Sequence, residues 1–150
     1  MSIRLTSAAF SPGSPIPKKH TGEGADISPP LAWSDLPPGT KELALICDDP
    51  DAPTPRPWVH WVLYGLSASL AGLTEGEADG GLSGPTDSGG PGYSGPMPPK
   101  GHGVHRYYFK LYALDASLGA KAGLTKEKLL AAMKGHILGV GELIGTYERK

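Results

Sequence analysis

The residue types best suited to chemistry occur in two short stretches, and the first combines carboxylates with a histidine. Asp49 and Asp51 flank Pro50 in a turn, and the apolar run that follows carries Trp58 and His60. If the turn is extended, both carboxylates point into one cavity. A carboxylate near an imidazole favours the protonated ring, which holds an anion through charge-assisted hydrogen bonds. This stretch therefore predicts acidic and imidazole walls of an anion-binding pocket.

The second stretch has the same construction. Pro98 and Pro99 form a stiff turn, and the run after it carries His105 and Tyr107. His105 would supply a second imidazole, and Tyr107 would supply a hydroxyl and an aromatic wall. Backbone N–H groups in turns of this kind often add donors for an anion. We predict that the two stretches meet in the fold and line one pocket for a small phosphorylated or carboxylate ligand.

Each of these residues also has a purely structural interpretation. Aspartate beside proline is a common turn former, and a single histidine on a strand is more often a core residue than a ligand. Two carboxylates and two histidines could instead bind zinc or iron, but neither H-x-x-x-H nor H-E-x-x-H spacing is present. Ser67, Ser83 and Ser94 lie near glycines, yet none has the G-x-S-x-G context of a nucleophile. Two clusters in one chain favour the shared pocket, without metal or cofactor.

The elements that position these residues are predicted to be strands. Residues 42–48 form a nearly continuous apolar run, which is typical of a strand inside a sheet, and residues 58–64 form the next strand. Side chains alternate between the two faces of a strand. The expected faces are Trp58, His60, Val62 and Tyr64 on one side, and Val59, Trp61 and Leu63 on the other.

Residues 104–115 form the longest predicted strand. His105 and Tyr107 share one face, and Arg106 lies on the other, where we expect it to form a structural ion pair with an aspartate of a neighbouring turn. A short helix is predicted to follow Thr125, a good N-cap residue, and to run to about Lys134. Residues 136–147 are again strand-like, and their glycines indicate a bulge or close backbone contact.

Length and charge narrow the class of protein. The chain has 150 residues, a net charge of −1 and a pI of about 6.5, so we expect one domain over residues 1–150 and no basic surface for nucleic acid. No run approaches the ~18 apolar residues of a membrane span, and no apolar segment near Met1 indicates secretion. Cys47 is expected in the core, and residues 18–20 in a solvated loop. These features predict a cytoplasmic protein without stable membrane insertion.

Glycine and proline define the fold class. They number 22 and 16, about a quarter of the chain, while hydrophobic residues reach 39% in discrete runs. Eleven of the glycines lie between residues 72 and 103, and a long loop inside a compact domain is often functional. The combination favours a turn-rich, mostly β fold with short strands and one or two short helices.

The two stretches resemble the phosphatidylethanolamine-binding protein family, also called Raf kinase inhibitor-like proteins. Residues 49–53 read D-P-D-A-P, and W-V-H follows at 58–60. Residues 97–107 resemble the family pattern G-x-P-P-x-G-x-x-H-R-Y, with one extra residue before His105. Residues 93–96 and 141–147 look like the bacterial and archaeal branch. The resemblance covers nearly the whole chain.

The resemblance implies a large antiparallel sheet packed on a smaller one, with Greek-key connections. It also implies a pocket for phosphate, acetate or phosphorylated head groups, and the matching residues are Asp49, Asp51, His60, Pro98, Pro99, His105 and Tyr107. Family members inhibit protein kinases or serine proteases or act as signalling scaffolds, and bacterial relatives are often homodimers. These are expectations carried by the resemblance and not by the residue patterns.

Three functional hypotheses follow. In the first, a non-enzymatic protein binds a small anion, which a partner protein such as a kinase or serine protease could present. In the second, the Asp and His cluster serves a hydrolase, with or without a metal. In the third, the chain is a pure interaction module such as a protease inhibitor.

Overall fold

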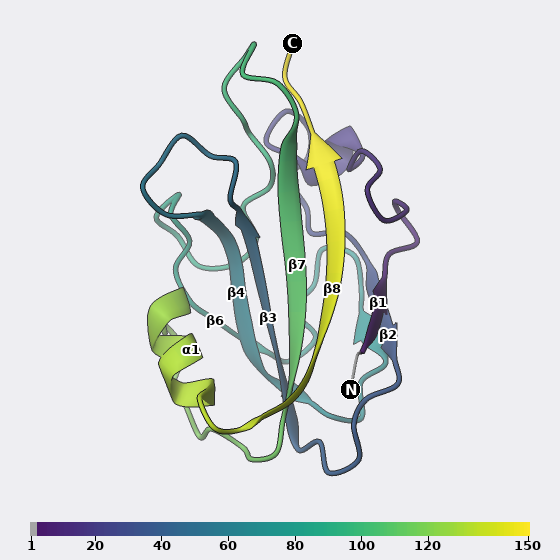
Figure 1. The fold of residues 1–150 in the computed structure, drawn as a ribbon, viewed down its shortest axis with the longest axis vertical. Coiled ribbons are helices and arrows are strands. Elements are labelled where there is room, and N and C mark those ends of the chain that lie inside the picture. The colour runs from purple at the N-terminus through teal and green to yellow at the C-terminus, as the bar shows by residue number, and fades with distance from the viewer. Residues whose placement is uncertain (1–2) are drawn as a thin grey trace.

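The computed structural model describes residues 3–150 and is built from two antiparallel sheets (Figure 1). The larger sheet has the strand order β6-β4-β3-β7-β8, and the smaller sheet has the order β1-β2-β5. The predicted mostly β fold, with a large sheet packed on a smaller one, is confirmed. The strands are β1 (Arg4–Thr6), β2 (Leu31–Ser34), β3 (Glu42–Asp49), β4 (Trp58–Ser67), β5 (Gly72–Leu73), β6 (Leu82–Ser83), β7 (His105–Leu114) and β8 (Ile137–Tyr147).

The main core lies between the two sheets. Leu45, Phe109 and Leu111 from the large sheet are fully buried there, and Leu31 and Trp33 from the small sheet pack against the same cluster. Cys47 belongs to this cluster as predicted. Burial of this kind contributes about 25 cal/mol per Å² of apolar area removed from water, so the facing apolar sides fix how the sheets stack.

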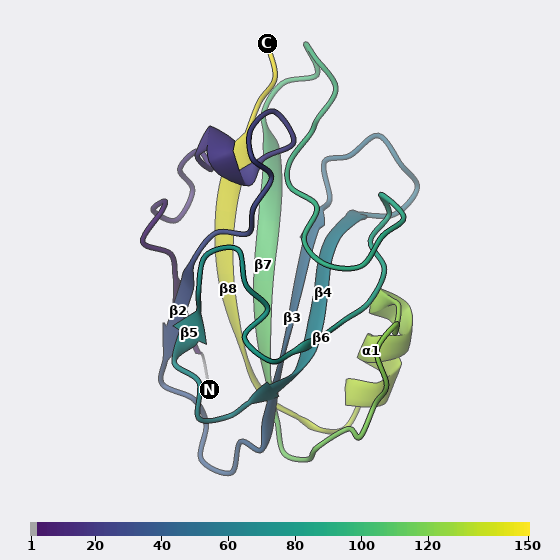
Figure 2. The same ribbon diagram turned by 180° about the vertical axis from the view of Figure 1, so that it is seen from behind.

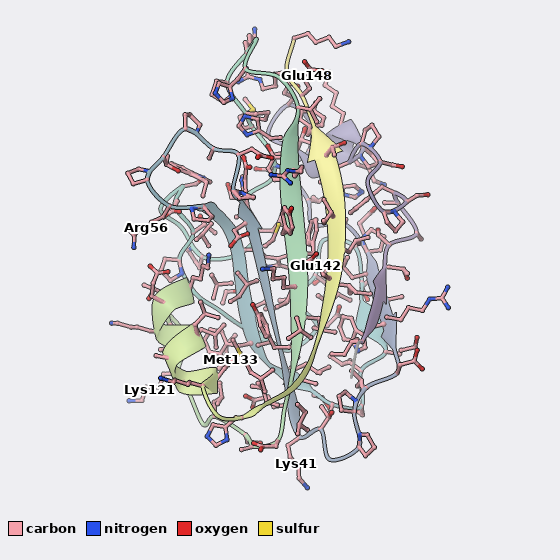
Figure 3. The ribbon with its side chains drawn as sticks, viewed as in Figure 1. Lys41, Arg56, Lys121, Met133, Glu142 and Glu148 are labelled. Carbon is pink, nitrogen blue, oxygen red and sulfur yellow. The ribbon has the colours of Figure 1, made fainter. Side chains whose placement is uncertain are left out.

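The helix α1 (Lys126–Met133) covers part of the opposite face of the large sheet (Figure 2). The Thr125 hydroxyl accepts a hydrogen bond from the Lys128 N–H, which confirms the predicted N-cap. Leu129 and Met133 are fully buried against the sheet, and Met133 lies on the side of α1 that faces β4 (Figure 3). Within residues 3–150, no helix has the length and apolar character that crossing a bilayer requires.

A β-bulge in β4 changes which face carries His60. Cys47 pairs with Trp61, but the next residue of β3, Asp48, pairs with Val59, so His60 is the extra residue. A bulge shifts the side-chain alternation by one position. His60 therefore lies on the same face as Trp61 and not with Val62 and Tyr64, and the predicted alternation is wrong at this point. The bulge turns the imidazole toward the face of the sheet that carries Tyr107.

The edge of the large sheet is covered by the N-terminal segment. The N–H groups of Ile3, Gly13 and Ile16 donate to carbonyls of β8, at distances of 3.3, 2.7 and 2.7 Å. A Cβ built on Gly145 would lie 2.6 Å from Ile16 Cγ1. The close contact predicted for the glycines of this strand is confirmed, and pairing of this edge removes an open template for aggregation.

The segment from Tyr93 to Met97 is held between β4 and the loop that follows the 3₁₀ helix η1 (Lys18–His20). The Tyr93 hydroxyl donates to the carbonyl of His20 at 2.6 Å, and the Gly95 N–H donates to Asp26 Oδ1 at 2.7 Å. The prediction of a solvated loop at residues 18–20 is wrong for His20, whose side chain is fully buried. The N-terminal loop thus supports the segment that leads to the second predicted stretch.

A substitution at Gly95 tests this packing. A Cβ there would lie 2.3 Å from the His20 carbonyl oxygen and 2.5 Å from Asp26 Oδ1, so the two segments must separate. We expect Gly95→Ala to lower the free energy of unfolding by about 1–3 kcal/mol in chemical denaturation. In Gly90→Ala, from the same glycine-rich segment, the added Cβ meets nothing within 4 Å, and the change should stay within about 0.5 kcal/mol. Equal stability of the two variants would contradict the close approach.

Candidate functional site

A cavity of about 450 Å³ lies at one end of the large sheet. The loop between β3 and β4, the segment before β7 and the loop after η1 surround it, and Figure 1 shows the first two extending beyond the sheet at the same end. The predicted residues that line it are Asp49, Trp58, His60, Pro98, Pro99, His105 and Tyr107. The structure therefore brings both stretches together in one pocket.

Asp51 is the exception, because its carboxylate does not line the cavity. Its Oδ2 accepts from the Arg106 backbone N–H at 2.8 Å and from Arg106 Nε at 2.9 Å, and its Oδ1 accepts from Nη2 at 2.9 Å. These bonds hold the pKa of Asp51 below its ordinary value. The ion pair predicted for Arg106 is confirmed. The expectation that both carboxylates enter the pocket holds for Asp49 alone, since Asp51 anchors the β3–β4 loop to β7.

The Asp49 carboxylate positions the ring of His105. It is 3% exposed, its Oδ2 lies 2.6 Å from His105 Nδ1, and its Oδ1 accepts the Asp51 N–H at 2.7 Å. A carboxylate accepts hydrogen bonds, so His105 carries a proton on Nδ1. The other nitrogen of His105, Nε2, lies 2.6 Å from His102 Nδ1. Asp49, His105 and His102 thus form a continuous hydrogen-bonded chain from the buried end of β3 to an exposed loop.

His60 forms the second imidazole wall. Its Nδ1 lies 2.6 Å from the Ser94 carbonyl oxygen, so this nitrogen donates and Nε2 remains for the pocket. Burial lowers the pKa of His60, and the hydrogen bond to Ser94 and the charge of Asp49 oppose this shift only in part. The resting ring is therefore neutral at pH 7, and the idea of a standing imidazolium does not apply to His60. Nε2 of the neutral ring is an acceptor. An anion can therefore bond to it only if the anion itself carries a proton, or if Nε2 takes up a proton from water on binding.

Tyr107 supplies an unused donor between the two histidines. Its ring contacts that of His60 edge-to-face, with centroids 5.2 Å apart. Burial raises the pKa of Tyr107, which keeps the hydroxyl protonated. That hydroxyl is buried and has no hydrogen-bond partner among residues 3–150. A buried polar group without a partner costs about 1–3 kcal/mol, so the hydroxyl is suited to a ligand oxygen.

Several residues of the site were not predicted as site residues. Asp26 and Gly22 line the pocket from the N-terminal loop, which no motif marked. Ser94, considered only as a nucleophile, instead holds His60 through its carbonyl oxygen. The sequence does contain an indication for His102, because a histidine between two glycines inside the second motif is a candidate site residue. Among the described residues, no group of three His, Cys, Asp or Glu side chains is arranged to hold a metal ion.

Comparison with known proteins places the chain in a family. Residues 6–148 match the sequence model of the phosphatidylethanolamine-binding protein family, and the chain belongs to this family. A UPF0098 protein of Methanothermobacter thermautotrophicus is 47% identical over 153 residues, covering 98% of this chain and 99% of the relative. A UPF0098 protein of Chlamydia muridarum is 49% identical over 151 residues, with the same coverage.

Solved structures agree with this assignment. The crystal structure of a phosphatidylethanolamine-binding protein homologue from Chlamydia trachomatis is 47% identical, covers 99% of both chains and superposes with a TM-score of 0.93. YbcL of E. coli, a member of the same family, has a TM-score of 0.92 at 29% identity and covers both chains fully. A carboxypeptidase Y inhibitor, solved in complex with its proteinase, has a TM-score of 0.59 at 18% identity, a likeness of fold alone.

The neutral state of His60 leads to a pH-dependent stability. Its folded pKa lies below the unfolded value of ~6.5, so the unfolded chain binds the proton first as pH falls. Stability is then full above ~6.5 and decreases below it. We expect His60→Asn, which keeps a donor for the Ser94 carbonyl but cannot titrate, to lose less thermal stability than wild type between pH 7 and pH 5. Identical losses in both proteins, measured without ligand, would show that His60 is not buried in neutral form.

Proposed function

We propose that the protein binds a small anion, a phosphoryl or carboxylate group, in the cavity between His60, Tyr107 and His105. The observation that carries the proposal is the buried Tyr107 hydroxyl, which donates to no residue among 3–150 although it lines a cavity. An anion oxygen at this position would satisfy the donor. His60 Nε2 lies on the same side of the pocket and would serve a second oxygen.

The protonation state of His60 selects the form of the anion. A neutral Nε2 is an acceptor, so it pairs with the P–OH of a phosphate monoanion or the O–H of a carboxylic acid. Protonation of Nε2 on binding makes the same contact charge-assisted. Whether the proton lies on the ligand or on Nε2, the complex holds one proton more than the free protein and the fully ionised ligand together. Binding is therefore stronger on the acid side of neutrality.

The remaining walls fit an organic group attached to the anion. Trp58, Met97, Pro98 and Pro99 give the cavity an apolar side. The volume of about 450 Å³ exceeds what one phosphate needs and lies in the range of small-molecule sites. A phosphorylated or carboxylate compound with a short apolar part would fill it, either free or presented by a partner protein such as a kinase or protease.

Thermal unfolding in the presence of inorganic phosphate tests the proposal. Ligand that binds only the folded protein stabilises it by about 2.7 kcal/mol at 100 times the Kd. We expect the midpoint temperature to rise with millimolar phosphate, and to rise more at pH 6 than at pH 8. A midpoint that phosphate, acetate and phosphoethanolamine all leave unchanged at both pH values would overturn anion binding. Release of phosphate from phosphoethanolamine would instead support the hydrolase alternative.

Tyr107→Phe separates binding from stability. The change removes a donor that the free protein leaves unpaired, so the ligand-free midpoint should stay the same or rise. Phosphate affinity should fall by about 10- to 100-fold, the effect of one hydrogen bond to a charged group. Tyr112→Phe is the matched control, because Tyr112 lies on the other face of the same strand, against the cluster under α1. Loss of affinity in the control but not in Tyr107→Phe would place the anion elsewhere.

A further inference from the structure

His105 lines the proposed anion site, yet both of its ring nitrogens are occupied by protein. Nδ1 is bonded to Asp49 and Nε2 to His102, each at 2.6 Å. The ring is 1% exposed. In this arrangement His105 can offer no hydrogen bond to a ligand, although it stands beside the donors that can. Either His105 is only a wall, or His102 must leave before an anion can form a hydrogen bond with His105.

The loop that carries His102 is an exposed glycine turn. His102 is exposed and lies between Gly101 and Gly103, which have φ values of 73° and 94°. Residues with a Cβ rarely adopt such φ values, and glycine adopts them freely. A Cβ built on either glycine would meet nothing within 4 Å, so no packed neighbour fixes them. Backbone bonds from Gly101 N–H to the Arg149 carbonyl oxygen and from His102 N–H to that of Pro99 tether the turn.

We infer that His102 is a latch on the anion site: in the ligand-free protein its imidazole occupies His105 Nε2, and the ligand oxygen takes that position when the His102 side chain rotates away from the tethered turn. The inference rests on the proposed anion binding and adds its regulation. Ring centroids 4.8 Å apart show that His102 covers the neighbouring imidazole edge-on. Ligand and latch then compete for one hydrogen-bonding position.

Proton counting shows what the ligand must replace. Nδ1 of His105 carries a proton for Asp49, so its Nε2 is an acceptor in the neutral ring and Nδ1–H of His102 donates to it. The P–OH of a phosphate monoanion or the O–H of a carboxylic acid is a donor of the same kind. The ligand and His102 therefore compete as donors to one ring nitrogen.

Other charged and titratable groups around the two rings come from four elements. They are Asp49 on β3 with Asp51 after it, Arg106 and Tyr107 on β7, Tyr147 opposite His105 on β8 with Glu148 and Arg149 beyond, and Lys100 on the latch loop. A His102 variant keeps all of these groups. It also keeps His60, which gains a proton on binding, so a comparison of variant and wild type at one pH cancels their contributions.

The ratio of phosphate affinities between His102→Ala and wild type cancels the effect of His60. His102 occupies His105 Nε2 in the ligand-free wild type, so at pH 6 the variant should bind phosphate about three- to tenfold more tightly, the value of one lost competing hydrogen bond. Isothermal titration with inorganic phosphate gives the ratio directly.

Two further variants sharpen the test. His102→Asn places an amide donor where Nδ1 lies, so the latch should stay closed and phosphate affinity should stay near that of wild type. His136→Ala is the matched control, because His136 is an exposed histidine bonded to Asp115 at 2.9 Å and precedes β8, whose other end lies beside His105. It should leave phosphate affinity unchanged.

The outcomes separate the latch from the function beneath it. If phosphate binds neither wild type nor any variant, the anion site itself is wrong. If wild type binds and His102→Ala binds equally or less tightly at pH 6, the site stands and the latch is overturned. Ring-nitrogen NMR of the ligand-free protein gives an independent check. The chemical shift of His105 Nε2 should change when His102 is removed, and an unchanged shift would show that the two rings are not bonded in solution.

Discussion

The functional end of this protein depends on a carboxylate that is buried and must be satisfied there. Asp49 is 3% exposed, and an unpaired charge in such a place is strongly unfavourable. One carboxylate oxygen accepts a hydrogen bond from His105 Nδ1 on β7. The other accepts a hydrogen bond from the backbone N–H of Asp51, in the turn that follows β3. The same residue therefore fixes the end of a strand, the start of a loop and the plane of an imidazole. Removing one partner of a buried pair costs about 3–5 kcal/mol, so these features form or fail together.

Asp51 and Arg106 extend that constraint toward solvent. Three bonds between 2.8 and 2.9 Å join the β3–β4 loop to β7, although the Arg106 side chain is half exposed. An exposed ion pair contributes little stability by itself. Its role here is geometric, because the loop it holds supplies Ala52, Pro53 and Thr54 to the pocket wall. The two carboxylates of the Asp-Pro-Asp turn thus have different roles: Asp49 orients His105, and Asp51 holds the loop against β7.

The sequence allowed the strands, the helix cap and the convergence of the two motifs to be predicted. Those features depend on local chemistry: apolar runs, a threonine before a helix, and prolines that stiffen turns. The alternation in β4 could not be predicted, because the bulge at His60 is visible only in the pairing of Asp48 with Val59. Without it His60 would face α1. The burial of His20 and the role of the Ser94 carbonyl oxygen could not be predicted either, since they depend on the packing of segments 73 and 34 residues apart in the sequence.

The pocket also shows why its polar groups are better explained by binding than by folding. A core optimised for stability would leave no buried hydroxyl unpaired and no imidazole held neutral by burial, because each costs free energy in the empty protein. Tyr107 and His60 carry both costs side by side, with ring centroids 5.2 Å apart, while Asp49 nearby is fully satisfied. Asp49 and His105 line the same cavity but are bonded to other residues of the protein, so the free donor and the free acceptor belong to Tyr107 and His60. An anion carrying one proton satisfies both at once, and an apolar ligand satisfies neither.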